Sequence, residues 1–482
     1  MWQTLGAGAA RGNPLIGPTG WGHAYPPIGG GAASTFLMAD RRIRASPGRS
    51  YDFFMTLTSA NTLQGAAPAD RRDDGPQADA RAAGWPPQIW LLLAGSFLVR
   101  ALGFAYPFLS YFVTERGHGA TFVSYVLAAF GAGWVIGQLV CGSLVDRIGG
   151  RLTLVVTMVV AAVVLCVLTA SHSQPMLIGG AVVFGLAFDA PRPVISATIA
   201  ELIPDSGQRA RIDAFRYGWV VNAGGAVTGA LGGLLAIRIG VPALFLVHAA
   251  ACVTFAALAL WFMPRSTRTA DTTPGLSGYR HAFADKRLVL VYLSSVATLT
   301  AMTAVLADMP MLMSLQGLGA DAFGWASVAN AVGVAAMTPV ITPWLSKRIA
   351  LRARLDILVV ASLWAAACMA AAAYAQTTLQ FSLVGLGVAL GETAWFVVAV
   401  GIVHRIAPAT QRGLYHGIWA TALPVAWIVS PLLASFSLDC GGAHMVAATT
   451  LVVGAVGAAI CLPLMRQLRT GSQPIESQET PW

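Results

Sequence analysis

Long runs of apolar residues, separated by short polar segments, follow one another from Trp90 to the C-terminal tail. Each run is about 20 residues long, the length of helix that crosses about 30 Å of hydrocarbon. The runs are apolar on every side, whereas barrel strands alternate apolar and polar residues. The pattern therefore predicts an all-α membrane protein of about twelve transmembrane helices. The starts of these spans are expected near Pro87, Thr121, Leu152, Pro175, Tyr217, Val241, Leu288, Phe323, Leu355, Thr378, Tyr415 and Gly442.

The composition agrees with a membrane protein and argues against other classes. Only 11% of the residues are charged and 56% are hydrophobic, with a mean hydropathy of +0.66, and a soluble domain does not bury that much apolar surface. The 6 cysteines form no CxxC pair and the 8 histidines no HExxH spacing, so we expect no metal site. The sequence contains no GxxxxGK[ST] phosphate loop and no Ser-His-Asp elbow. We therefore expect no cofactor, no ATP-driven transport and no enzyme.

The lysines and arginines predict how the chain is oriented. Every second loop is rich in Lys and Arg, with Arg216 counted among these loop residues, whereas the opposite loops hold only Arg116 and Arg238. Because cells retain positively charged loops on the cytoplasmic side, both termini are expected in the cytoplasm of a multi-pass protein of the plasma or inner membrane. The net charge of +9 then reflects topology and gives no support to nucleic-acid binding.

The two ends of the chain differ from the rest. Residues 1–86 are rich in Gly, Ala and Pro and hold no apolar run long enough for a signal peptide, so we expect a disordered cytoplasmic extension. A mis-assigned start codon is an equal alternative, with Met38 and Met55 as possible true starts. Residues 466–482 are expected to form a cytoplasmic tail.

The spans fall into two similar sets. The polar segment 264–286 divides them into an N-terminal bundle, 87–263, and a C-terminal bundle, 287–465, of about six helices each. Short stretches recur between the sets, such as "LVDR" and "LSKR", and at an offset of about 200 residues Asp189 falls on Glu392. Two pseudo-symmetric six-helix halves are a transporter architecture, with a binding site near the midplane between them.

One loop carries a resemblance to a known family. "GSLVDRIGGR", residues 142–151, follows the second span and resembles the GxLaDrxGrr signature of the major facilitator superfamily. The segments "DAPRPVISATIAELIP" in span four, "RYGWVVNAGGAVTGALGGLLA" in span five and "MPMLMSLQGLGADAFGWASVAN" after span seven resemble its drug:proton antiporter branch, particularly the multidrug-resistance H-like group. That branch carries a Gly-Pro in span five where this chain has Thr228 and Gly229, a departure that weakens the case for proton antiport.

The same loop contains the residues that we expect to form a conformational gate. Gly142 and Gly149 would permit a tight turn and close helix approach. The resemblance implies that Asp146 faces the positive N-terminal end of span eleven and clamps the two halves on the cytoplasmic side. Arg147 and Arg151 either belong to this gate or merely anchor the topology.

Four charged residues lie well inside the predicted spans: Arg100, Asp189, Arg192 and Glu392. A charge at the centre of a membrane helix costs about 2.5 to 3.5 kcal/mol, so such residues usually face a cavity or a partner. The prolines of "FDAPRP" predict a kink or local unwinding at Asp189, and we interpret this segment as cavity lining. A buried ion pair between Asp189 and Arg192 is the alternative.

Glu392 has no basic neighbour within one helical turn, so we expect it to take up a proton in coupling. A packed, hydrogen-bonded glutamic acid is the alternative. Asp308 is expected to reach the outer interface. Further cavity candidates are aromatic or polar residues that could instead serve packing or bonds between helices: Tyr106, Trp395, Asn222 and Asn330.

These features predict a secondary active transporter that exports an amphipathic or drug-like small molecule in exchange for protons, by alternating access of the halves. The alternative is a uniporter or symporter of a small metabolite in the same fold, and a non-transporting membrane sensor is a third possibility. The expected partners are a small-molecule substrate, protons and the lipid bilayer. We expect a monomer whose energy source is the proton gradient.

Overall fold

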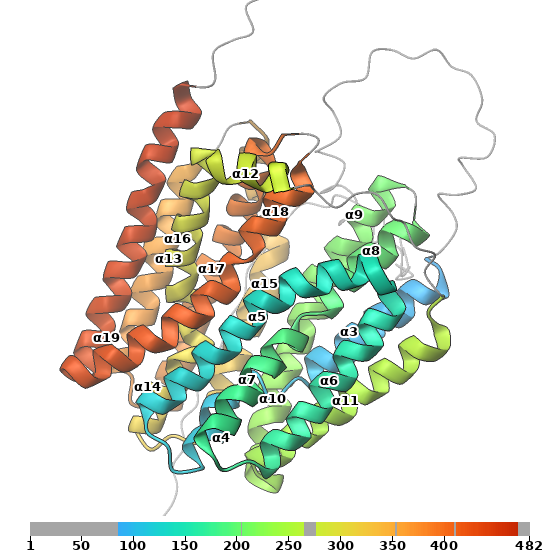
Figure 1. Cartoon of the computed structure of the whole chain (residues 1–482). Coiled ribbons are helices and arrows are strands. Elements are labelled where there is room, and N and C mark those ends of the chain that lie inside the picture. Colours follow the sequence, from blue (N-terminus) through green and yellow to red (C-terminus); the bar gives the residue numbers. More distant parts are fainter. Residues whose placement is uncertain (1–84, 204, 265–275, 352–353, 409–410, 471–482) are drawn as a thin grey trace, which may run out of the picture. The chain divides into compact units, whose positions relative to one another are not determined.

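The computed structural model describes residues 85–203, 205–264, 276–351, 354–408 and 411–470. Most of the predicted extension 1–86, residues 265–275 of the central segment and residues 471–482 of the tail lie outside these ranges. Within them, every regular element is a helix, which confirms the predicted all-α fold (Figure 1).

The N-terminal half runs from α3 to α11. Its helices are α3 (Pro87–Ala101), α4 (Leu109–Thr114), α5 (Ala120–Ile148), α6 (Gly150–Ala170), α7 (Gln174–Phe188), α8 (Pro191–Leu202), α9 (Ser206–Phe215), the π-helix η1 (Arg216–Val220), α10 (Val221–Ile239) and α11 (Val241–Phe262). The helices pack on a continuous core of buried aliphatic and aromatic side chains, with Phe112 stacked on Phe245 at 4.0 Å between ring centroids.

The C-terminal half runs from α12 to α19. Its helices are α12 (Leu276–Ala284), α13 (Lys286–Ala307), α14 (Met309–Leu315), α15 (Ala320–Leu351), α16 (Leu355–Ala371), the 3-10 helix η2 (Ala372–Tyr374), α17 (Thr378–Ile406), α18 (Arg412–Ala420) and α19 (Ala422–Thr470). The central segment predicted as a loop thus contains a helix, α12, and α19 continues into the predicted tail. The helix α19 folds back at Gly441 and Gly442, where the backbone leaves helical geometry.

Nine segments of the described chain are long and apolar enough to cross a membrane. They differ in number from the predicted spans for identifiable reasons. The first span is divided into α3 and α4, so α3 has only 15 residues. The last segment, Arg412–Leu468, contains the turn at Gly441 and Gly442 and hence two predicted spans. The helix α10, which covers the fifth predicted span, is not among the nine.

Three of the predicted spans are broken near their middles or outer thirds. The break in span four separates α7 from α8 at Asp189, as the prolines predict, because Pro191 begins α8 without a backbone donor. Spans one and seven are also interrupted, by residues 102–108 and at Asp308. Pro107 and Pro310 accompany these two breaks, which the sequence analysis did not predict.

The two halves contact each other along α10 and α15 and along α5 and α19. Where α10 meets α15, glycines allow the backbones to approach closely. A Cβ atom built on Gly229 would lie 2.9 Å from the Cβ of Ser327, and one built on Gly324 would lie 2.7 Å from the carbonyl oxygen of Gly229. Small residues at such crossings are typical of membrane helices.

Candidate substrate cavity

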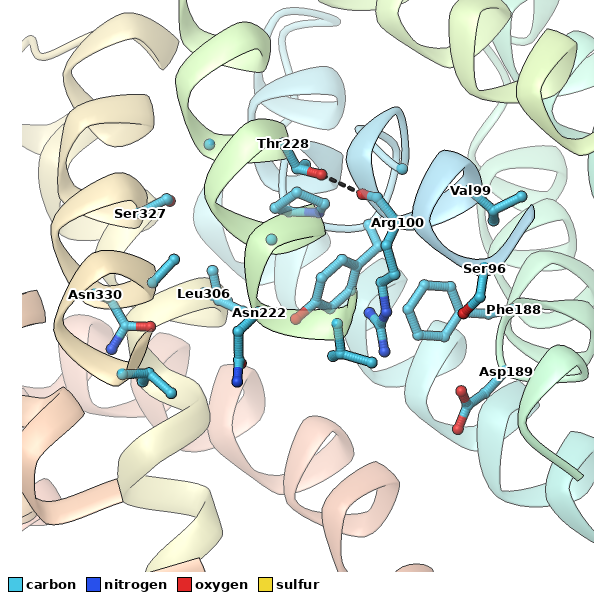
Figure 2. Close-up of a pocket in the computed structure, with 18 of the residues that line it drawn as sticks. Ser96, Val99, Arg100, Phe188, Asp189, Asn222, Thr228, Leu306, Ser327 and Asn330 are labelled. Atoms are coloured by element: carbon cyan, nitrogen blue, oxygen red, sulfur yellow. Dashed lines mark hydrogen bonds between the residues drawn. The ribbon is translucent and has the colours of Figure 1, made fainter. Parts of the chain in front are cut away.

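A cavity of about 250 Å³ lies between the halves. In Figure 2, Arg100 and Asp189 enter it from helices of the N-terminal half, and Ser327 and Asn330 from α15 of the C-terminal half. Seven of the eight predicted cavity residues line it: Arg100, Tyr106, Asp189, Arg192, Asn222, Asn330 and Glu392. The cavity therefore lies where the pseudo-symmetry of the sequence places a transporter site.

Asp189 is held at the break between α7 and α8 by three donors. The Nε atom of Arg192 lies 3.1 Å from Oδ2, the amide of Gln138 donates at 2.6 Å, and the indole of Trp134 donates at 3.2 Å. Asp189 is 9% exposed and Arg192 28% exposed. The two interpretations of "FDAPRP" are thus combined, because the residues form an ion pair and also line the cavity.

Arg100 lies in the last turn of α3 with its guanidinium carbon 5.4 Å from the centre of the Phe188 ring. Within the described ranges, no acidic side chain lies within 4.0 Å of this guanidinium. The carbonyl group of Arg100 accepts a hydrogen bond from Thr228 on α10 (Figure 2). Arg100 thus combines a fixed backbone with a cationic group that no described carboxylate neutralises.

The departure in span five has a structural role. The same hydroxyl oxygen lies 3.1 Å from the carbonyl oxygen of Ala101, and so Thr228 ties α10 to the end of α3 beside the cavity. Its neighbour Gly229 forms the close approach to α15. A Gly-Pro pair at these positions would place no hydroxyl at the Thr228 position and would add a ring where Gly229 meets Ser327. The chain therefore uses this point of α10 to join both halves.

Glu392 enters the cavity from the middle of α17, which stays continuous although its counterpart span is broken. Its side chain is half-buried. The amide of Asn330 donates to Glu392 at 3.5 Å and to the carbonyl oxygen of Gly385 at 3.1 Å. As predicted, no basic side chain of the described chain pairs with Glu392. The matched acids Asp189 and Glu392 thus have different surroundings.

Aromatic rings form one wall of the cavity. Tyr106 lies 5.0 Å from the ring of Phe188 and 5.0 Å from that of Trp427, measured between centroids. Trp395, by contrast, does not line the cavity and was wrongly placed there. It is fully buried in the core of the C-terminal half, where it packs against Phe396 and Trp419. Its neighbours in α17 are largely apolar and did not reveal the direction of its side chain.

The sequence analysis missed Arg216 as a cavity residue and counted it among the loop arginines. The structure places it at the start of the π-helix η1, 3% exposed and in the cavity lining. Its guanidinium donates to Ser196 at 3.1 Å and to the carbonyl oxygen of Arg192 at 3.2 Å, and lies 3.9 Å from Asp213. The apolar stretch that follows it was the only available signal.

Comparison with known proteins gives the family. The Major Facilitator Superfamily pattern matches residues 89–322 and 291–482. The chain belongs to this superfamily. Its structure is similar to that of the nucleoside transporter NupG (14% identity, 79% of this chain and 99% of that chain, TM-score 0.64). It is also similar to a POT family transporter solved in complex with 5-aminolevulinic acid (13% identity, 81% and 98%, TM-score 0.65). At these identities the likeness shows the fold.

The structure describes most of the residues that were predicted to form a conformational gate. Gly149, with φ of 82°, forms the turn between α5 and α6, as predicted, and Arg151 donates to the carbonyl oxygen of Leu260 on α11. Arg147 is exposed. The prediction for Gly142 was wrong, because this residue lies inside α5 with open space beside it. It forms neither a turn nor a close approach between helices. The side chain of Asp146 lies outside what the structure describes, so the clamp remains a prediction.

The halves meet at the helix ends opposite the Gly149 turn. At the start of α5, the Thr121 hydroxyl donates to Asp439 of α19 at 3.3 Å. The Tyr111 hydroxyl of α4 donates to the carbonyl oxygen of Leu318 at 3.3 Å. In the orientation predicted from the loop charges, this end faces the outside. These contacts connect the halves on the outer side of the cavity.

Proposed function

We propose that this transporter moves a small solute with an anionic group, and that the movement is coupled to protons at Glu392. The observation that carries the proposal is Arg100, a guanidinium in the cavity with no described carboxylate on it. A cation removed from water is costly unless it is paired. A carboxylate or phosphate group of the solute would supply that pairing in the bidentate geometry that arginine favours.

The other charges of the cavity support this assignment. Arg192 is paired with Asp189, and Arg216 has Asp213 and Ser196 beside it. Arg100 and Glu392 remain, one on α3 and the other on α17. A solute with an anionic group and a donor group would have a partner in each half. Halves that bind opposite ends of one molecule can close around it, as alternating access requires.

Glu392 is the proposed proton carrier because it is half-buried and has one long amide hydrogen bond. Such surroundings do little to stabilise the charge of an ionised carboxylate. Protonation removes the charge without a counter-ion. The structures similar to this chain are those of a nucleoside transporter and of POT family transporters in complex with a thioalcohol-conjugated peptide and with 5-aminolevulinic acid, and they suggest three kinds of molecule to test.

The test is transport by the purified full chain in proteoliposomes with an imposed pH gradient. The probes are labelled 5-aminolevulinic acid, a dipeptide, uridine and, as an amphipathic cation, ethidium. We expect pH-dependent movement of a probe that carries a carboxylate. Arg100→Ala should abolish it, whereas the control Arg238→Gln, at an exposed helix end, should not. Equal transport by Arg100→Ala and the wild type would refute the role of Arg100.

Glu392→Gln tests the coupling separately. The amide imitates the protonated acid, so gradient-driven transport should fail while exchange of labelled for unlabelled solute continues. Full gradient-driven transport by Glu392→Gln would move the proton carrier elsewhere. Solute binding without movement by the wild type would favour the non-transporting sensor.

A second candidate is proton-coupled export of amphipathic compounds, the first hypothesis from the sequence. The rings of Tyr106 and Phe188 in the cavity lining favour it, because aromatic faces attract a drug-like cation. In the same liposomes, ethidium movement driven by the pH gradient, with no movement of the carboxylate probes, would select this candidate. Movement of a carboxylate probe without any pH response would select uniport.

A further inference from the structure

Asp308 lies at the junction of α13 and α14, in the C-terminal half and away from the substrate cavity. The sequence analysis placed it at the outer interface, but it is only 5% exposed. Its carboxyl group does not cap α14. Instead, the Ser430 hydroxyl oxygen of α19 lies 3.0 Å from each of its two oxygens.

This carboxyl group has few partners that could stabilise a negative charge. Within the described ranges, no Lys, Arg or His lies within 4.0 Å of it. The hydroxyl of Ser430, itself 1% exposed, is the one donor that the described residues provide. A buried ionised carboxylate normally accepts several hydrogen bonds or pairs with a cation. The ionised form is therefore poorly accommodated in this arrangement.

The number of hydrogen atoms available around Ser430 also favours a protonated Asp308. The Ser430 oxygen also lies 3.0 Å from the carbonyl oxygen of Thr300, which is an acceptor only. The hydroxyl has one hydrogen and three acceptor oxygens around it. If Asp308 carries a proton, it donates to Ser430, and Ser430 donates to Thr300. The chain of hydrogen bonds is then complete from the carboxyl group to the backbone.

A small cavity of about 20 Å³, lined by hydroxyl-bearing and apolar side chains, adjoins Asp308. It is large enough for one water molecule. Hydroxyl groups from α19 lie along it, with Ser437 and Thr449 at 2.8 Å from each other. None of the residues that line this cavity also lines the substrate cavity. A water molecule in this cavity, beside the Asp308 carboxyl group, would be the acceptor of its proton when the site opens to water.

The packed elements bring no second titratable group to this cavity among the described residues. On α19, Asp439 and His444 are exposed beyond it, and on α15 Asp321 is exposed at the start of the helix. On α4, Tyr111 is bonded to Leu318. On η2, Tyr374 is exposed and lies 3.4 Å from His444. Titration of this site is thus a property of Asp308.

We propose that Asp308 and Ser430 form a second proton-binding site, separate from Glu392 and occupied by one proton while α13 and α19 are packed together as in this structure. The proposal does not depend on the substrate or on Glu392, because it rests on residues within one half. Since Asp308 forms the junction of α13 and α14, loss of its proton leaves a buried charge at a helix break. Proton release is therefore expected to accompany opening of the contact between α13 and α19.

Infrared difference spectroscopy of the reconstituted full chain tests the proposal. The carbonyl band of a protonated carboxyl group should be present in the wild type at neutral pH and lost in Asp308→Asn. The control Asp321→Asn, at an exposed acid, should retain it. Because Glu392 can contribute a band of its own, the same comparison is repeated in Glu392→Gln. An unchanged carboxyl band in Asp308→Asn in both backgrounds would overturn the proposal, whatever Glu392 does.

Two further measurements protect the test from a folding defect. Ser430→Ala removes the acceptor of the carboxyl proton, so the band should move to higher frequency without disappearing. The melting temperature of the wild type should fall relative to that of Asp308→Asn as the pH rises from 5 to 8, because the folded state holds the extra proton. The melting temperature is also compared in choline and in Na⁺ solutions. A rise in Na⁺ that occurs in the wild type but not in Asp308→Asn would identify a metal-cation site and refute the proposed proton site.

Discussion

Replacing Gly324 by alanine tests whether the contact between α10 and α15 holds the outer side closed. The new Cβ atom would lie 2.7 Å from the carbonyl oxygen of Gly229 and 2.8 Å from the Cα atom of Gly233. Ordinary contacts are about 3.3 Å for carbon to oxygen and about 3.5 Å for carbon to carbon. The two helices must therefore separate by about 0.6 Å or accept strain, and overpacking of this kind costs about 1 to 3 kcal/mol.

The cost falls mainly on the state in which the two halves are in contact. If the strain is relieved when the outer side opens, the closed-to-open ratio should decrease by about 5-fold to 150-fold, since about 1.4 kcal/mol is a factor of ten. The assay is the rate at which a short bis-maleimide joins Thr121→Cys to Asp439→Cys, across the contact between α5 and α19. The background carries serine at the exposed cysteines Cys166 and Cys440.

A graded series makes the result decisive. A Cβ atom on Gly233 would lie 3.1 Å from the Cα atom of Gly324, so Gly233→Ala should slow cross-linking less than Gly324→Ala. Gly179, inside α7, has nothing within 4 Å of its built Cβ, and Gly179→Ala should match the wild type. Wild-type cross-linking rates in Gly324→Ala, at wild-type thermal stability, would refute the reasoning. Equal slowing in all three variants would do the same.

Two other predictions concern carboxylates with known partners. Asp189→Asn should lower stability by about 3 kcal/mol, because Arg192 keeps its charge without a carboxylate, and Asp189→Asn with Arg192→Gln should recover part of it in thermal unfolding. Although partial burial opposes ionisation, hydrogen bonds from Arg287 and Tyr415 hold the pKa of Asp285 below its usual value. The ionised carboxylate therefore stabilises the folded state above about pH 4, and this contribution is lost below that pH. The difference in melting temperature between the wild type and Asp285→Asn should accordingly disappear on acidification, and a constant difference would contradict this.

Much of the site was predictable because charge inside a membrane is costly. Arg100, Asp189, Arg192 and Glu392 were expected in a cavity on that ground alone, and all four line it. The break at Asp189 was predictable as well, since Pro191 cannot donate the hydrogen bond that would continue α7. Both predictions rest on large local costs, that of a charge in the membrane and that of a proline inside a helix, each about 3 kcal/mol.

The direction of uncharged side chains was not predictable in the same way. A membrane helix such as α17 carries apolar residues over most of its surface, so the sequence did not show that Trp395 faces the core. Distance along a helix also misled, because it placed Asp308 at the interface although the chain bends there and α19 covers it. Arg216 was assigned to a loop for a related reason, since the π-helix that carries it into the cavity leaves no distinct pattern.

The two halves repeat each other in sequence but not in their charges. Span four is broken at Asp189, which is surrounded by three donors including a cation, whereas span ten is continuous at Glu392, which has one amide. Fixed hydrogen-bond donors stabilise the ionised form of a carboxyl group, whereas a buried carboxyl group without such donors favours its protonated form. The roles proposed for these matched positions therefore differ, with a structural role for Asp189 and proton binding for Glu392. Transport that survives Glu392→Gln but fails in well-folded Asp189→Asn would reverse this order.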